Sequence, residues 1–132
     1  MNMEYLEKCR HSLSSEQAKS LAETDNWGHV DKQQVHTDWD SLYKELSLLI
    51  GSLKPAEKKA QEMIGRHFKI TCRFYVPSKE AYIGMGLFYS ENNDMKNFHN
   101  AYHPQMVAFL GDAMTVYAQE NLASLPHRPV GI

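Results

Sequence analysis

The sequence has no run of basic residues and no excess of positive charge. Its 132 residues include 14 Lys and Arg against 16 Asp and Glu, which gives a formal net charge of −2. A protein that binds nucleic acid directly needs a basic surface to meet the phosphates. We therefore expect no direct nucleic-acid partner.

Long hydrophobic runs are also missing. The first residues, Met1-Asn2-Met3-Glu4-Tyr5, lack the basic and apolar blocks of a signal peptide, and no segment approaches the length of a membrane span. We expect a cytoplasmic protein with no membrane partner. Cysteine is scarce as well, because Cys9 and Cys72 are the only two. Two cysteines do not make a disulfide framework, so we predict two reduced thiols.

No segment alternates apolar and polar residues with the period of a strand, whereas helical spacing recurs along the chain. The composition, 42% hydrophobic and 23% charged, is that of one soluble globular domain. We predict a single all-α domain over residues 1–132, with about four substantial helices and one or two short ones.

The N-terminal half contains two predicted helices. Ser14 with Gln17 three residues later has the form of a capping box, so a short helix is expected from Ser14 to about Glu23. Residues 24–28 then form a turn that carries an exposed Trp27. The strongest amphipathic pattern follows, from Val35 to near Gly51, and either Asp31 or Thr37 could cap its start.

Prolines mark the helices of the C-terminal half. Pro55 suits the first turn of a third helix, which Pro77 ends, and Pro104 suits the first turn of the last long helix. A short polar element is expected over residues 95–100. The tail, residues 125–132, contains two prolines and is expected to be extended.

A central stretch, Ala81 to Tyr89, contains no charge, no amide and no aliphatic hydroxyl. Ser78 before it is a good N-cap, so the stretch is predicted to be a buried central helix, surrounded by protein or by protein on one side and a bound apolar ligand on the other. Gly84 and Gly86 inside it each cost roughly 1 kcal/mol relative to Ala in a helix interior. Some neighbour must therefore require the missing side chains.

Sites of chemistry are hard to find. The spacings of His29 and His36, and of His99 and His103, do not form a metal-binding motif, and these imidazoles are expected to lie at the surface. His67 in the third helix could bind haem from one side, but a hydrogen-bonded structural role is the commoner case. No serine or cysteine has the context of an activated nucleophile. We predict no catalytic residue, no metal and no cofactor, hence no enzyme.

Large side chains gather in the middle of the chain. They are mostly aromatic, and the set is Trp39, Phe68, Phe74, Tyr75, Tyr82, Met85, Phe88 and Tyr89. Phe and Met fill cores without further explanation, whereas a buried Tyr hydroxyl needs a polar partner. The tyrosines are compatible either with the lining of a pocket for a large flat ligand or with a core whose hydroxyls reach the surface.

Several short motifs resemble the TipAS-type antibiotic-recognition domain, the effector module of TipA-like regulators in the MerR family. They are Asp38-Trp39, Arg73-Phe74-Tyr75, Glu80, Gly86-Leu87-Phe88-Tyr89, Asn97 and Phe109-Leu110-Gly111-Asp112-Ala113. The resemblance runs from about Thr37 to Asn121. Residues 1–30 fall outside it, and they are expected to be flexible.

The resemblance implies a globin-like helical fold with a deep cleft for bulky hydrophobic antibiotics such as thiopeptides. It also implies a role in drug resistance or transcription regulation, by sequestering the drug or as a regulator's effector domain. The founding member can capture its ligand through a cysteine, and that position falls on Gly84 here, so reversible binding is expected.

Aligning the family cleft with this chain places Tyr75, Tyr82, Met85 and Phe88 near the ligand. Together with Trp39, His67 and Gly84 they are the seven predicted ligand-binding residues. The alternative is a helical protein-interaction or regulatory module whose aromatic residues are simply core. The sequence leaves the oligomeric state open, a homodimer included.

Overall fold

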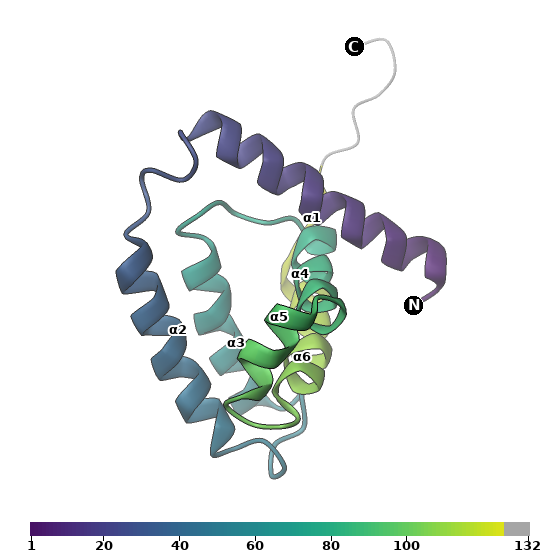
Figure 1. Cartoon of the computed structure of the whole chain (residues 1–132). Coiled ribbons are helices and arrows are strands. Elements are labelled where there is room, and N and C mark those ends of the chain that lie inside the picture. Colours follow the sequence, from purple (N-terminus) through teal and green to yellow (C-terminus); the bar gives the residue numbers. More distant parts are fainter. Residues whose placement is uncertain (126–132) are drawn as a thin grey trace.

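The computed structural model describes residues 1–125 and contains six helices in that range (Figure 1). They are α1 Met3–Glu23, α2 Lys32–Ser47, α3 Lys58–Thr71, α4 Lys79–Glu91, α5 Asn93–Asn100 and α6 Met106–Asn121. The β structure of the described residues is limited to one isolated bridge between Ile50 and Leu53. The all-α prediction is confirmed. All of the predicted extended tail beyond Leu125 lies outside the described residues.

Helix α4 is the centre of the fold, as its apolar sequence predicts. It packs against α1, α5 and α6, while α2 and α3 pack side by side and α3 contacts α6 (Figure 1). The Ser78 side chain accepts a hydrogen bond from the Ala81 backbone N–H, which confirms the predicted N-cap. Eight residues of α4 are buried, from Glu80 to Tyr89.

The two glycines of α4 let neighbouring helices approach closely. A Cβ at Gly84 would lie 2.3 Å from the backbone oxygen of Cys9 in α1, and a Cβ at Gly86 would lie 3.2 Å from the Cα of Gly111 in α6. At Gly86 the missing side chain is therefore explained by the close approach of α6. At Gly84 the missing side chain is explained by the α1 backbone rather than by space left for a ligand.

The N-terminal helix is longer than predicted. α1 begins at Met3, where the Asn2 side chain caps it by accepting from the Tyr5 backbone N–H, so the predicted start at Ser14 is wrong. Residues 3–23, expected to be flexible, form this helix. Its apolar residues Cys9 and Leu13 are buried against α4, and this tertiary packing overrides the local capping signal.

Polar contacts fix α1 to the start of α4. The Tyr5 hydroxyl donates to the Glu80 carboxylate at 2.9 Å, and the backbone N–H of Ser78 donates to the Glu16 carboxylate at 2.9 Å. The Ser78 hydroxyl donates to the same carboxylate. Helix α1 is thus part of the folded domain.

Other helix boundaries differ from the predictions near prolines. Helix α2 begins after Asp31, one of the two predicted caps, and ends at Ser47 before Gly51. Helix α3 begins at Lys58 rather than Pro55, and α6 begins at Met106 rather than at residues 102–104. Both prolines lie in the turns that precede the helices, where their fixed φ is equally suitable.

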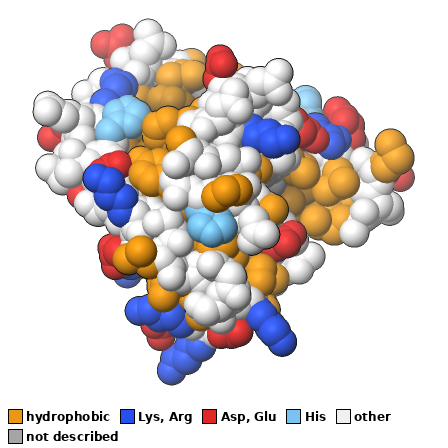
Figure 2. All heavy atoms as spheres, turned by 60° about the horizontal axis from the view of Figure 1, so that its bottom comes forward, with side chains coloured by type: hydrophobic (Ala, Val, Ile, Leu, Met, Phe, Trp, Pro, Cys, Tyr) orange, Lys and Arg blue, Asp and Glu red, His pale blue; other side chains and the backbone are white. Residues whose placement is uncertain are grey.

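Charges of both signs are interspersed on the surface, and Figure 2 shows hydrophobic side chains exposed between them. Six ion pairs join acidic and basic side chains in the described residues, for example Arg10 with Glu91 at 2.7 Å. Between residues 1 and 125, no helix has the length and apolar character needed to cross a membrane.

Replacing Gly84 with Ala is expected to lower the free energy of unfolding by about 2–3 kcal/mol or more, because the new methyl group overlaps the α1 backbone. Gly111→Ala is the matched control, since its Cβ would meet nothing within 4 Å. The control is expected to be neutral or stabilising by up to about 1 kcal/mol, because Ala is the better helix former. Urea unfolding measures both, and equal effects would contradict the packing role of Gly84.

Candidate functional site

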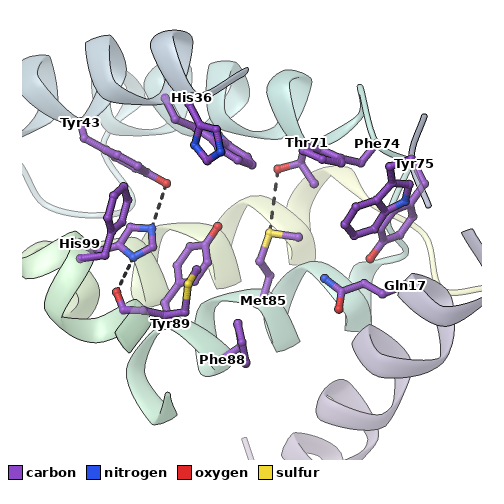
Figure 3. Close-up of a pocket in the computed structure, with 14 residues that line it drawn as sticks. Gln17, His36, Tyr43, Thr71, Phe74, Tyr75, Met85, Phe88, Tyr89 and His99 are labelled. Carbon is purple, nitrogen blue, oxygen red and sulfur yellow. Dashed lines mark hydrogen bonds between the residues drawn. The ribbon is translucent and has the colours of Figure 1, made fainter. Parts of the chain in front are cut away.

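A cavity of about 330 Å³ opens between α2, α4, α5 and the α1 and α3 ends that face them (Figure 3). Most of its lining side chains are aromatic. The lining consists of Gln17, Trp27, His36, Trp39, Tyr43, Thr71, Phe74, Tyr75, Met85, Phe88, Tyr89, Met95, Phe98 and His99. The volume lies within the usual range for small-molecule sites.

Stacked rings form one end of the cavity. Trp39 lies nearly parallel to Phe74, with ring centroids 5.9 Å apart and an angle of 12° between the planes. Trp27 meets the same Phe74 edge to face at 4.9 Å. Phe88 and Phe98 line the cavity while 41% and 50% of their surfaces remain exposed, so they form part of its mouth. A flat apolar ligand would find aromatic faces on several sides.

No Lys, Arg, Asp or Glu from the described part of the chain lines this cavity. Its polar groups are the Gln17 amide, the Thr71 hydroxyl, the indole N–H groups of the tryptophans, tyrosine hydroxyls and imidazoles. An ionised ligand group buried there would lack a partner of opposite charge, which is costly. The site is therefore suited to an uncharged ligand.

His67 lies behind the cavity wall and is fully buried. Its Nδ1 is 2.8 Å from the Tyr82 hydroxyl and its Nε2 is 3.4 Å from the Tyr89 hydroxyl. Burial, with a smaller effect from His99, lowers the pKa of His67 to about 3, so the imidazole is neutral at physiological pH. The hydrogen-bonded structural interpretation of His67 is the one that its surroundings support.

His99 is also buried, and the prediction that it lies at the surface is wrong. Its Nδ1 is 2.7 Å from the Met95 carbonyl oxygen and its Nε2 is 3.2 Å from the Tyr43 hydroxyl (Figure 3). The ring stacks on Tyr89 with centroids 4.1 Å apart. Burial lowers its pKa, although the Met95 carbonyl partly opposes this. Helix α5 has only eight residues. So short a segment shows too little apolar periodicity to indicate from the sequence that His99 is buried.

Four of the seven predicted ligand-binding residues line the cavity: Trp39, Tyr75, Met85 and Phe88. His67 and Tyr82 are fully buried behind it, joined by their hydrogen bond. Gly84 lines a second hollow of about 280 Å³ between α1 and α4, and the two hollows share Gln17 and Phe88.

Several lining residues were not among the predicted site residues. Trp27 was expected to be exposed but is half-buried and lines the cavity. His36 is exposed, as expected of a surface imidazole, and it also lines the cavity. Tyr43 occupies the position four residues after Trp39, on the same face of α2. That spacing was the one signal in the sequence that could have identified it.

Two buried polar atoms at the cavity have no hydrogen-bond partner among the described residues. They are the indole Nε1 of Trp39 and the hydroxyl oxygen of Tyr75. An unpaired buried polar group costs about 1–3 kcal/mol. Each such group in a native protein needs an explanation, for which a role in function or an ordered water molecule can account.

Neither cysteine lines the cavity. Both are free thiols, and burial raises the pKa of Cys9 and of Cys72, which makes each thiolate scarce. Through residue 125, no three His, Cys, Asp or Glu side chains come together as a group that could hold a metal ion. The arrangement offers surfaces for binding.

Comparison with known families gives one match. The profile of the TipAS antibiotic-recognition domain matches residues 5–117, which includes most of α1 as well as the cavity. The match extends further towards the N-terminus than the resemblance in the sequence motifs. No curated protein and no solved structure is significantly similar.

The buried neutral His67 predicts a pH-dependent stability. The unfolded chain takes up a proton near pH 6.5 that the native protein does not bind until about pH 3, so the free energy of unfolding falls as the pH is lowered through this window. His67 contributes a slope of about 1.4 kcal/mol per pH unit. Unfolding by urea at a series of pH values should show a smaller slope for His67→Gln, and equal slopes would contradict a buried neutral imidazole.

Proposed function

Because this chain belongs to the family of TipAS antibiotic-recognition domains, we propose that its cavity binds a bulky hydrophobic small molecule without forming a covalent bond. The ligand is a thiopeptide-like or other large aromatic antibiotic. TipAS is a ligand-recognition family rather than an enzyme family, in keeping with the prediction of no catalytic residue.

The observation that carries this proposal is the uncharged aromatic cavity. Rings from α2, α4, α5 and the segment after α3 surround about 330 Å³ of space, and no charged side chain of residues 1–125 lines it. A space of this size encloses a compact aromatic compound or one aromatic arm of a larger one. A thiopeptide would therefore insert a part of its structure.

Burial supplies the affinity. Covering a few hundred Å² of apolar surface at roughly 25 cal/mol per Å² contributes several kcal/mol before the cost of ordering is subtracted. The cavity is already built by packed helices, which keeps that cost low. Reversible binding fits the lining, since it contains no thiol.

The biological role we propose is sequestration of the antibiotic, either by a stand-alone domain or by the effector domain of a drug-responsive transcription regulator. A cytoplasmic setting and the lack of a direct nucleic-acid partner belong to the same proposal. Sequestration lowers the free drug concentration in proportion to the amount of protein and needs no chemical step.

Tryptophan fluorescence tests the proposal directly, because both tryptophans of the chain, Trp27 and Trp39, line the cavity. Titration with thiostrepton and with a panel of smaller planar aromatic antibiotics should quench or shift the emission with a saturable curve. Failure of every compound to do so would contradict the proposal and favour the alternative of a protein-interaction module.

Two charge-introducing variants locate the site. Phe98→Glu places a carboxylate at the apolar mouth and is expected to weaken binding by about tenfold or more. Leu48→Glu is the control, since Leu48 is 84% exposed and does not line the cavity. Affinities from the same fluorescence titration should fall in the first variant alone. Equal losses would show that the ligand binds elsewhere.

A further inference from the structure

The second hollow, of about 280 Å³ between α1 and α4, adjoins the aromatic cavity. Gln17 of α1 and Phe88 of α4 line both spaces, so the two meet at this pair of side chains (Figure 3). Phe88 is 41% exposed and forms part of the cavity mouth. A ligand whose flat part lies in the aromatic cavity can therefore extend past the Phe88 ring into the second hollow.

One face of each helix forms the second hollow. Each face contributes three residues at steps of four and three along the chain, which are Arg10, Ser14 and Gln17 on α1 and Gly84, Phe88 and Glu91 on α4. At a rise of 1.5 Å per residue, seven residues of helix extend over roughly 10 Å. Because about three extended residues cover that length, the hollow can hold a short chain.

The second hollow combines apolar surface with uncharged polar groups. Leu13, which is 6% exposed, and Phe88 supply the apolar part. The Ser14 hydroxyl and the Gln17 side-chain amide supply the polar part, and neither side chain is hydrogen-bonded to another residue between 1 and 125. Both groups can donate and accept. An amide bond has the same two abilities, so a chain of amides is a suitable partner for them.

The two charged side chains that line the second hollow are paired with each other. The Arg10 Nε donates to the Glu91 Oε1 at 2.9 Å, and the Arg10 Nη2 donates to the Glu91 Oε2 at 2.7 Å. The Arg10 Nη1 donates to the Glu7 carboxylate at 3.0 Å. A charged ligand group would have to compete with these contacts. The hollow is therefore suited to an uncharged chain.

We propose that the second hollow is a second subsite, which holds an uncharged, amide-bearing arm of the ligand whose aromatic part occupies the first cavity. This inference rests on the proposed binding function and narrows its ligand class to compounds with both parts. The rings stack on the aromatic walls, while the amides of the arm pair with Ser14 and Gln17. A ring compound without an arm uses the first cavity alone.

Acridone carboxamides provide the probes, because they carry an arm on a flat uncharged ring system. The parent is the primary carboxamide, and the extended probe carries glycyl-glycinamide on the same carbonyl. Both are made as 2- and 4-isomers, so that the arm leaves the ring in two directions. Isothermal titration should show that the arm raises the affinity about tenfold in at least one isomer. A hexyl arm of similar length should raise it less.

The outcomes separate the two proposals. If the parent binds and neither isomer gains from the amide arm, the second subsite is contradicted and the proposed binding function stands. An equal gain from the hexyl arm would contradict the preference for amides. If neither the parent nor the extended probes bind, the proposed function itself is contradicted for this ligand class, and the second subsite falls with it.

Ser14→Phe and Ser15→Phe form a matched pair of variants. The two serines are exposed neighbours on α1, but Ser14 lines the second hollow and Ser15 lines neither space. A phenyl ring at position 14 occupies the hollow, so the tenfold gain from the arm should disappear while the affinity of the parent stays within about twofold. Ser15→Phe should keep the gain. A gain retained in both variants, or lost equally in both, would overturn the second subsite.

Leucine methyl signals locate the arm in the wild-type protein. Leu13 lines the second hollow, whereas Leu21 of the same helix lines neither space and serves as the reference. With carbon-13 leucine labels, the saturating extended probe should shift the Leu13 signals clearly more than the saturating parent does, and should leave Leu21 in place. Equal Leu13 shifts from the two probes would show that the arm lies elsewhere and would overturn the inference.

Discussion

The close contact of α4 with its neighbours is the constraint on which the rest of the structure depends. Because Gly84 has no side chain, the α1 backbone can pack directly against α4 on one side, and Gly86 allows the same close contact with α6 on another. With those sides occupied, Met85, Phe88 and Tyr89 are left to line the cavity. The two glycines, which weaken an isolated helix, thus hold α4 in the position that gives the site its floor.

The cavity combines apolar walls with neutral polar groups, and burial accounts for both. Desolvation holds His67 uncharged and raises the pKa of the tyrosines around it, so the site keeps a set of hydrogen-bonding groups without a net charge. Aromatic faces provide most of the contact area, and hydroxyl and imidazole groups determine the orientation in which a ligand can bind. Such a lining favours flat, uncharged compounds over ions.

The sequence predicted the helices better than it predicted the site. Ser78 and the apolar run after it identified α4, because cap and core signals agreed there. The start of α1 was missed, since the contact of Cys9 with Gly84 joins residues distant in sequence. Trp39 and Phe88 stood out as large apolar side chains, whereas His36 and His99 lie among polar neighbours, and local sequence does not indicate that the fold turns them towards the cavity.

The most direct test of the central claim uses the methionine methyl groups as reporters inside the protein. Met85 and Met95 line the cavity, whereas Met63, Met106 and Met114 are buried and do not line it. With carbon-13 methionine labels, addition of acridone, a flat uncharged tricyclic ketone that represents the proposed ligand class, should shift the Met85 and Met95 signals through its ring current and leave the other three in place. Unchanged Met85 and Met95 signals at saturating acridone, or equal shifts of all five, would contradict binding in this cavity.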